Sequence, residues 1–187
     1  MARVVFIGAG PGAADLITVR GARHLADAEV VLFDALTDPA LREQAPNARW
    51  LDVGKRGFAH ATGQARINAL LVRLALSGAR VVRLKGGDPS VFGRLEEELQ
   101  ALAAHGIDYE VVPGVTAALA AAAQAGRPLT RRGRGRSVTL TTAVTAVADD
   151  GAADELHASA GRADTEVFYM AGKQLGRLGR LPRLPRQ

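Results

Sequence analysis

Polar and glycine-rich segments follow four short apolar runs of the 187-residue sequence. They are Gly8–Gly12, Asp34, Lys55 and Gly86–Pro89. A carboxylate and an ammonium group can accept and donate a proton in catalysis when their surroundings favour it. Asp34 and Lys55 are therefore a candidate acid/base pair, although the same residue types also form simple ion pairs at the edge of a sheet.

The first glycine segment has the relaxed spacing of a dinucleotide-binding loop. Gly8, Gly10 and Ala13 follow an apolar run, and Asp34 lies roughly twenty residues further on. Pro11 removes a backbone N–H donor where a pyrophosphate would need one, and glycines at such a place often serve only the turn. A nicotinamide or flavin cofactor is therefore disfavoured.

The second glycine segment, Gly86–Pro89, allows the backbone to approach a flat or bulky ligand closely. Its Asp88 can accept hydrogen bonds from hydroxyl or ammonium groups, or can cap the turn itself. Four basic residues lie near the candidate segments in the sequence: Arg56, Arg83, Lys85 and Arg94. These residues either neutralise a polyanionic substrate or pair with the acidic run Glu96–Glu98.

Residues 127–136 carry five arginines and no acidic residue, and we call them the arginine loop. A basic loop suits a phosphate, a polycarboxylate or a nucleic acid, whereas the simpler interpretation is a solvated loop. Aromatic residues make up only 4% of the chain, which argues against a surface that stacks nucleic-acid bases. We therefore expect no nucleic-acid partner.

The composition is that of a globular protein, with 48% hydrophobic and 23% charged residues. No segment approaches the roughly 18–20 apolar residues that span a bilayer, and Met1–Arg3 leads into an apolar run rather than a signal peptide. The chain has no cysteine, and its four histidines lack metal-ligand spacing. We expect a soluble, cytoplasmic protein that binds neither membrane nor metal.

Short apolar runs alternate with helical periodicity up to residue 112. The runs predict strands at 4–7, 30–33, 51–53, 81–84 and 109–112. Helices are predicted at 16–28, with Asp15 as N-cap, and at 67–76 and 96–104. This alternation indicates an α/β fold with a mostly parallel sheet, whose ligands bind beyond the carboxyl ends of the strands. We therefore expect the candidate segments to lie together at one edge of the sheet.

Pro113 and Gly114 interrupt this alternation and predict a domain boundary. The expected domains are residues 1–113 and a smaller α/β domain at 114–187. The second domain is predicted to hold a helix at 116–125, a helix or loop at 149–161, and strands at 137–143 and 166–170. The repetitive Arg, Leu, Gly and Pro residues of 173–187 predict an irregular tail.

Six motifs resemble, in order, those of the tetrapyrrole (corrin/porphyrin) methylases. They lie at residues 5–21, 53–56, 82–94, 111–117, 126–131 and 167–170. The resemblance implies two α/β domains with S-adenosylmethionine in the cleft between them, and a homodimer. Because the family continues with further strands where this chain ends, we expect the second domain to be truncated.

The resemblance also assigns roles to individual residues. S-adenosylmethionine would be bound by Pro11, Gly86, Gly87, Asp88, Val91, Thr116, Ala117 and Met170. Asp34 would be the proton acceptor and Lys55 the proton donor. Since this cofactor carries no phosphate, Pro11 is no longer unfavourable in the first glycine segment.

The implied reaction methylates two pyrrole carbons of uroporphyrinogen III and gives precorrin-2, for siroheme and cobalamin biosynthesis, with S-adenosylhomocysteine as the by-product. The sulfonium already makes the methyl group electrophilic, so the reaction requires no metal. The substrate's carboxylates would be bound by Arg56, Arg83, Lys85 and Arg94, with Arg131 and Arg132 as further candidates.

The chain departs from the family pattern at several positions. Ala13 and Ala14 replace the Asp-Pro that usually ends the first glycine loop, and Arg131 stands where a histidine is common. Two alternatives to the implied reaction stay open. One is methylation of a later precorrin, and the other is a truncated, non-catalytic homologue that binds cofactor, tetrapyrrole or a partner.

Overall fold

The computed structural model describes residues 3–54, 63–142, 163–172 and 176. The chain divides into two compact units, residues 1–120 (unit 1) and 121–187 (unit 2). The domain boundary expected at residue 113 stays a prediction. The segment expected at 149–161 and nearly all of the predicted tail at 173–187 lie outside the described residues.

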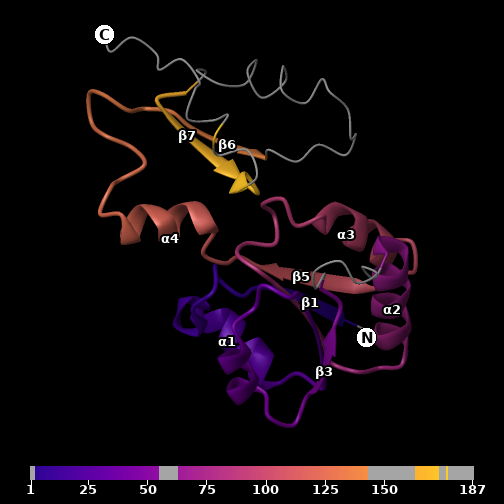
Figure 1. Ribbon diagram of the computed structural model, residues 1–187. Helices are drawn as coiled ribbons and strands as arrows, with labels where there is room; N and C mark the ends of the chain where they lie inside the picture. The colour runs from indigo at the N-terminus through magenta and orange to yellow at the C-terminus, as the bar shows by residue number, and fades with distance from the viewer. Residues whose placement is uncertain (1–2, 55–62, 143–162, 173–175, 177–187) are drawn as a thin grey trace. The chain divides into compact units, whose positions relative to one another are not determined.

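The described part of unit 1 is built on a parallel five-stranded sheet (Figure 1). Its strands are β1 (Arg3–Gly8), β2 (Val30–Phe33), β3 (Arg49–Asp52), β4 (Val81–Lys85) and β5 (Asp108–Val112). They are arranged in the order β3-β2-β4-β1-β5. All five predicted strands and the parallel sheet are confirmed. Strand β2 is buried throughout and reads as a continuous apolar run, whereas the edge strand β3 is not buried and begins two residues before its predicted start.

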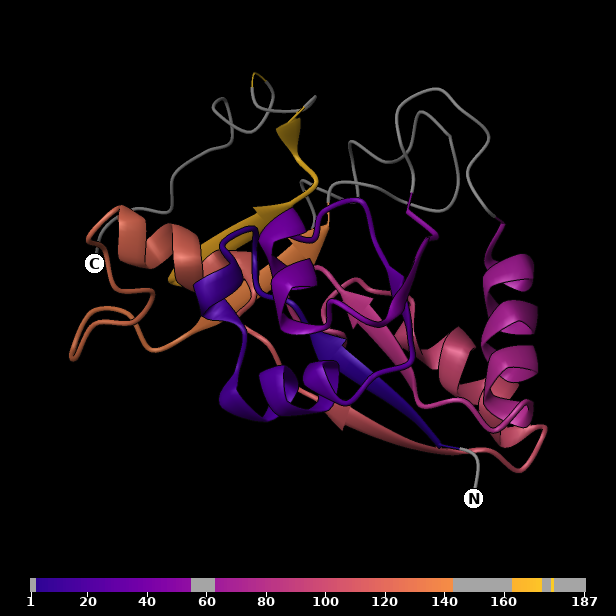
Figure 2. The same cartoon turned by 90° about the horizontal axis from the view of Figure 1, so that it is seen from below.

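Helices cover both faces of this sheet. They are α1 (Val19–Ala26), α2 (Gln64–Leu76) and α3 (Leu95–Ala103), with the short 3₁₀ helices η1 (Ala14–Leu16) and η2 (Pro39–Gln44). On one face α1 and η2 bury Leu25 and Leu41, and on the other α2 and α3 bury Leu71 and Leu102. Figure 2 shows the strands between the indigo α1 and the magenta α2.

The connections after two neighbouring strands leave toward opposite faces. The chain passes from β1 through α1 on one face to β2, and from β4 through α3 on the other face to β5. In open parallel sheets, ligands bind at the carboxyl ends of two such strands. The segments that follow β1 and β4 are Gly8–Gly12 and Gly86–Pro89. The topology therefore selects the two glycine segments that the sequence singled out.

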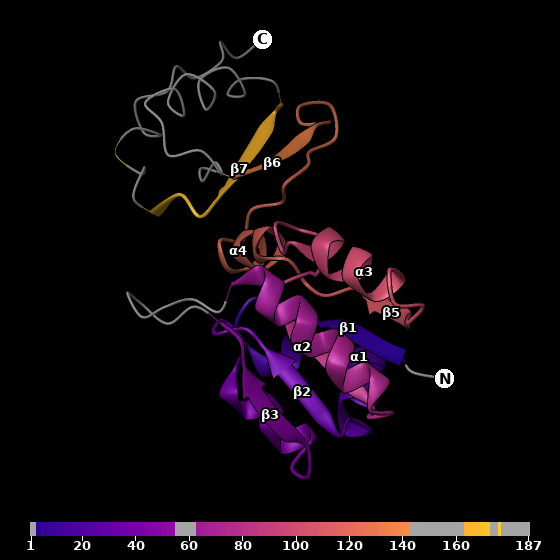
Figure 3. The same ribbon diagram turned by 90° about the vertical axis from the view of Figure 1, so that its right-hand side faces the viewer.

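Strand β4 brings two charged side chains into the core. Val81 packs in the cluster that includes α2 and α3, whereas Val82 and Leu84 pack in the cluster that includes α1. Because successive side chains of a strand point to opposite faces, Arg83 and Lys85 point to the same face as Val81. Both are buried, at 2% and 3% exposure. They lie beneath α3, which Figure 3 shows on this face.

The first helix begins later than predicted, and Asp15 is not its N-cap. Residues 14–16 form η1, and α1 begins at Val19. Its N-cap is Thr18, whose Oγ1 accepts a hydrogen bond from the backbone N–H of Gly21 at 3.1 Å. A threonine hydroxyl satisfies one of the free N–H groups of the first turn, so the helix begins here.

The described part of unit 2 contains a pair of parallel strands. They are β6 (Val138–Thr142) and β7 (Thr165–Tyr169), which lie side by side in Figures 1 and 3. The Asp164 carboxylate, just before β7, accepts hydrogen bonds from the backbone N–H groups of Arg136 and Ser137 at 2.9 and 3.0 Å. Helix α4 (Ala117–Gln124) spans the boundary between the two units. The predicted helix and both predicted strands are present.

Candidate active site

The loops after β1, β4 and β5 meet backbone to backbone. Gly10 and Gly87 exchange two backbone hydrogen bonds, with N···O distances of 3.2 and 2.7 Å. A Cβ atom on Gly8 would lie 2.5 Å from the Cα of Gly114, and one on Gly114 would overlap the carbonyl oxygen of Gly87. Since no side chain fits between these loops, the glycines are required for the loops to converge.

Asp88 fastens two of these loops together. Its Oδ2 accepts a hydrogen bond from the backbone N–H of Gly114 at 2.9 Å, and its Oδ1 accepts one from Ser90 at 2.8 Å. The second bond is the turn cap that was the alternative interpretation of this aspartate. Asp88 therefore holds the loop after β4 to the loop after β5 in the protein itself, and its contact with a cofactor stays a prediction.

The structure places seven of the eight predicted cofactor residues on or next to these loops. They are Pro11, Gly86, Gly87, Asp88, Val91, Thr116 and Ala117. A Cβ on Gly87 would lie 3.9 Å from the Cα of Thr116, so the loops after β4 and β5 are adjacent there as well. The eighth, Met170, belongs to unit 2, directly after β7, with a positive φ of 54° and 55% exposure.

Asp34 lies at the carboxyl end of β2 and is paired with an arginine. Its Oδ1 accepts a hydrogen bond from Nη2 of Arg83 at 2.6 Å, and its side chain is 30% exposed. Its backbone carbonyl accepts from Thr37, through the N–H at 3.1 Å and the hydroxyl at 2.8 Å. The predicted proton donor Lys55 and the predicted substrate residue Arg56 lie outside the described residues. The acid/base pair therefore stays a prediction.

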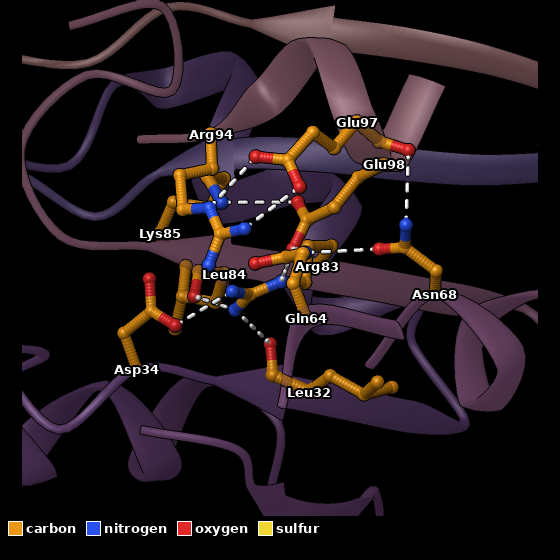
Figure 4. Close-up of polar contacts among 10 residues, drawn as sticks. All are labelled: Leu32, Asp34, Gln64, Asn68, Arg83, Leu84, Lys85, Arg94, Glu97 and Glu98. Atoms are coloured by element: carbon orange, nitrogen blue, oxygen red, sulfur yellow. Dashed lines mark hydrogen bonds and ion pairs between the residues drawn. The ribbon is translucent and has the colours of Figure 1, made fainter. Parts of the chain in front are cut away.

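A buried carboxylate lies behind Arg83 and joins it to Lys85 (Figure 4). Glu98, on α3, is 1% exposed. Its Oε1 accepts from Nε of Arg83 at 3.0 Å, and its Oε2 accepts from Nζ of Lys85 at 2.9 Å. Gln64 donates to Oε1 at 3.3 Å. We call Asp34, Arg83, Lys85 and Glu98 the buried charge cluster.

Burial is the main electrostatic influence on Lys85. It lowers the pKa of the ammonium group below its usual value, and the nearby Arg83 guanidinium lowers it further. The carboxylates of Glu98 and Asp34 oppose this change without reversing it. The positive charge of Lys85 is therefore less stable than that of an exposed lysine.

Three predicted substrate residues are paired with carboxylates of the protein. Arg83 and Lys85 contact Glu98, and Arg94 pairs with Glu97 at 2.7 Å. Pairing with the acidic run 96–98 was the alternative to substrate binding for these basic residues, and the structure contains these ion pairs. Substrate binding by the three residues stays a prediction, and Arg83 and Lys85 would have to leave a buried carboxylate to reach a ligand.

The buried role of Glu98 went unrecognised in the sequence. Leu95 precedes it by three residues, and Leu102 follows it by four, so Glu98 shares the inward face of the helix. A carboxylate on such an apolar face requires a buried cation. The strand at 81–85 supplies two, on alternate residues, and this combination is the signal that could have revealed the cluster.

The described part of the chain shows no metal-ligand cluster and no membrane-spanning helix. No three or more His, Cys, Asp or Glu side chains there are grouped to hold a metal ion. None of the helices described is both long enough and apolar enough to cross a membrane.

Known proteins match this chain in both sequence and architecture. The family model named Tetrapyrrole (Corrin/Porphyrin) Methylases matches residues 3–183. The uroporphyrinogen-III C-methyltransferase of Pseudomonas aeruginosa is 52% identical over 143 residues, which cover 76% of this chain and 58% of that protein. The siroheme synthase of Pseudomonas fluorescens is 50% identical over 172 residues, which cover 89% of this chain and 36% of that protein.

A solved structure extends the match to the fold. The uroporphyrin-III C-methyl transferase of Thermus thermophilus, complexed with S-adenyl homocysteine, is 40% identical with a TM-score of 0.79, over 98% of this chain and 78% of that one. This chain spans 58% and 36% of the lengths of the two curated relatives above. Because the family model covers nearly every residue, the chain belongs to the tetrapyrrole (corrin/porphyrin) methylases.

Proposed function

We propose that the chain forms much of an S-adenosylmethionine-dependent enzyme that methylates uroporphyrinogen III at carbon and gives precorrin-2. The observation that carries the proposal is the convergence of three glycine-bearing loops at the carboxyl ends of β1, β4 and β5. The relatives with names of this activity, at about half identity, support the choice of substrate.

The chemistry of these loops suits such a cofactor. Segments 8–12, 86–89 and 113–117 contain no lysine or arginine, and their one acidic residue is Asp88. A phosphate-bearing ligand would call for cations or free N–H groups, and Pro11 offers neither. A ligand without phosphate that carries a positive sulfur fits these loops better. The proposed cofactor residues are the eight named from the resemblance, Met170 included.

In the proposed mechanism, the protein positions the reactants and removes a proton. When bound, S-adenosylmethionine supplies an electrophilic methyl group. The ring carbon that receives the methyl group already carries a side chain and no hydrogen, so it becomes quaternary, and the positive charge left on the macrocycle is removed by loss of a proton from another position. Asp34 is suited to accept this proton, because Arg83 binds its Oδ1 while its Oδ2 receives no hydrogen bond from a described residue.

Two further parts of the proposal concern residues whose contacts with ligands are not in the structure. Lys55 is proposed as the proton donor, and Arg56 as a residue that binds a substrate carboxylate.

A homodimer is proposed as the assembly, and sedimentation velocity of the full chain would measure it. A single monomeric species at all concentrations would contradict this part.

Binding and turnover of the full chain test the proposal. Isothermal titration with S-adenosylhomocysteine should give a saturable heat of binding. Transfer of a labelled methyl group to uroporphyrinogen III, with the absorbance of precorrin-2, should then give turnover. Turnover only with a later precorrin would support the alternative substrate class. The absence of any binding heat would instead favour the non-catalytic homologue.

Asp34→Ala tests the role of the proton acceptor. We expect turnover to fall about 100-fold or more, as when a general base is removed, while affinity for S-adenosylhomocysteine changes little. Steady-state kinetics and titration measure the two effects separately. Thr37→Ala, which removes only the hydroxyl that binds the Asp34 backbone, is the matched control. Unchanged turnover in Asp34→Ala would remove this residue from the mechanism.

Gly87→Val tests the position of the cofactor. Among the described residues other than its two chain neighbours, only the Thr116 Cα, at 3.9 Å, lies within 4 Å of the added Cβ, so the Cβ itself meets no protein clash. A β-branched residue at the observed φ of 68° is strained, so thermal unfolding must accompany the titration. We expect loss of S-adenosylhomocysteine binding in a folded protein. Retained binding would mean that the cofactor lies elsewhere.

A further inference from the structure

The buried charge cluster joins the core to the candidate site through one guanidinium group. Arg83 binds Glu98 through Nε at 3.0 Å and Asp34 through Nη2 at 2.6 Å. Its Nη1 donates to the carbonyls of Leu84 at 3.1 Å and Leu32 at 3.5 Å. Every nitrogen of this guanidinium therefore has an acceptor, and a planar group held at all three nitrogens has a single orientation.

Burial decreases from one end of the cluster to the other. The side chains of Glu98 and Arg83 are 1% and 3% exposed, whereas that of Asp34 is 30% exposed. Figure 4 shows Arg83 between the two carboxylates, with Asp34 on the side opposite α3. An exposed carboxylate alone would rotate freely about its side-chain bonds. Here its position is set from the interior of the protein.

We infer that Glu98 and Arg83 are positioning residues for the reaction. Glu98 fixes the guanidinium of Arg83, and Arg83 fixes the carboxylate of Asp34, whose Oδ2 receives no hydrogen bond from the described part of the chain and would accept the proton. This inference rests on the proposed function, because it uses Asp34 as the proton acceptor. It reassigns Arg83 from substrate binding to the support of Asp34. Lys85 balances the charge of Glu98, whose second oxygen it occupies.

The first test needs no turnover. Nuclear magnetic resonance of the arginine side chains in the full chain should show separate Nη signals for Arg83, since its guanidinium cannot rotate. The exposed Arg94 provides the internal comparison. Glu98→Gln should average the Arg83 signals, because a neutral amide replaces the carboxylate and Lys85 loses its partner. Glu97→Gln, one residue away and exposed, is the matched control and should leave them separate.

A second variant guards against misfolding. Glu98→Gln leaves Lys85 buried without a carboxylate, which can unfold the chain. Glu98→Gln combined with Lys85→Met removes that cation and should give the same averaged signals. Averaged Arg83 signals in the unaltered chain would overturn the inference, whether or not the chain methylates its substrate. Separate Arg83 signals in both Glu98→Gln and the double variant Glu98→Gln/Lys85→Met would also overturn the inference.

The second test uses turnover and separates positioning from general stability. Glu98→Gln should lower kcat about 100-fold, the usual cost of a misplaced catalytic group, and leave KM for S-adenosylmethionine unchanged. In an Asp34→Ala background the same substitution should have no further effect on kcat. An equal loss in both backgrounds would mean a structural role and would overturn the inference. If the unaltered chain shows no turnover, the proposed function fails, and the resonance test still decides the inference.

Discussion

Two adjacent glutamates on α3 have opposite surroundings. Glu97 has a side chain 45% exposed and pairs with Arg94, which is 54% exposed. Glu98 is 1% exposed and pairs with Arg83 and Lys85, both nearly fully buried. The Arg94 hydrogen bond holds the pKa of Glu97 below its usual range. One residue step along the helix therefore separates an ion pair in water from one in the core.

The comparison shows what each pair contributes. An exposed pair gains little, because water and salt screen both charges. A buried pair also adds little stability relative to an apolar core. Removal of one partner is costly, however, because it leaves the other charge buried and uncompensated. Glu98 is thus important for the arrangement of its neighbours, whereas Glu97 is dispensable.

Glu98→Ala should have the largest effect. Removing this carboxylate leaves Arg83 and Lys85 buried without their shared partner, so we expect a loss of about 3–5 kcal/mol in the free energy of unfolding. Urea denaturation of the full chain measures it. Glu97→Ala is the matched control and should leave the free energy of unfolding nearly unchanged. Equal effects of the two substitutions would contradict the difference between the two sites.

Lys85→Met should change how stability depends on pH. The pKa of Lys85 is lowered in the folded protein, first by burial, whereas it is 10.5 in the unfolded chain. Between these two values the unfolded chain binds a proton that the folded protein does not, so stability rises with pH. Lys85→Met should remove a slope of at most about 1.4 kcal/mol per pH unit. Denaturation curves from neutral pH to pH 10.5 measure it, and identical slopes would mean that Lys85 is not desolvated.

The sheet was predictable because its strands have a simple sequence pattern. Strands buried on both faces read as continuous apolar runs, and Val30–Phe33 was predicted with its observed bounds. The start of the first helix could not be predicted in the same way, since Asp15 and Thr18 are both acceptable N-caps. Only the turn formed by residues 14–16 decides between them. Local sequence gives the elements, but competing caps are resolved by tertiary structure.

The loops of the site were predictable, whereas the support behind them was not. Glycines after strands, together with the parallel topology, place Gly8–Gly12 and Gly86–Pro89 at one edge. The buried charge cluster needs a contact between β4 and α3, which no local pattern contains. The acidic run at 96–98 reads as a uniform solvated face. The fold treats its members differently, because only Glu98 shares the inward face with Leu95 and Leu102.

Arg94→Gly should have the smallest effect and the opposite sign. Arg94 precedes α3 with a positive φ of 53°, a conformation that costs a residue with a side chain roughly 1–2 kcal/mol and costs glycine almost nothing. Its pair with Glu97 is exposed on both sides and compensates for only part of this strain. We therefore expect Arg94→Gly to raise the free energy of unfolding by up to about 1 kcal/mol.

Arg94→Ala is the control for this last comparison. It removes the same guanidinium but keeps a Cβ at the strained position, so it should be less stable than Arg94→Gly. Urea denaturation of both variants separates the ion pair from the backbone strain. If Arg94→Gly were more stable than Arg94→Ala but less stable than the unaltered chain, the exposed pair could not be the weak interaction that its solvation implies. The distinction between Glu97 and Glu98 would then rest on something other than burial.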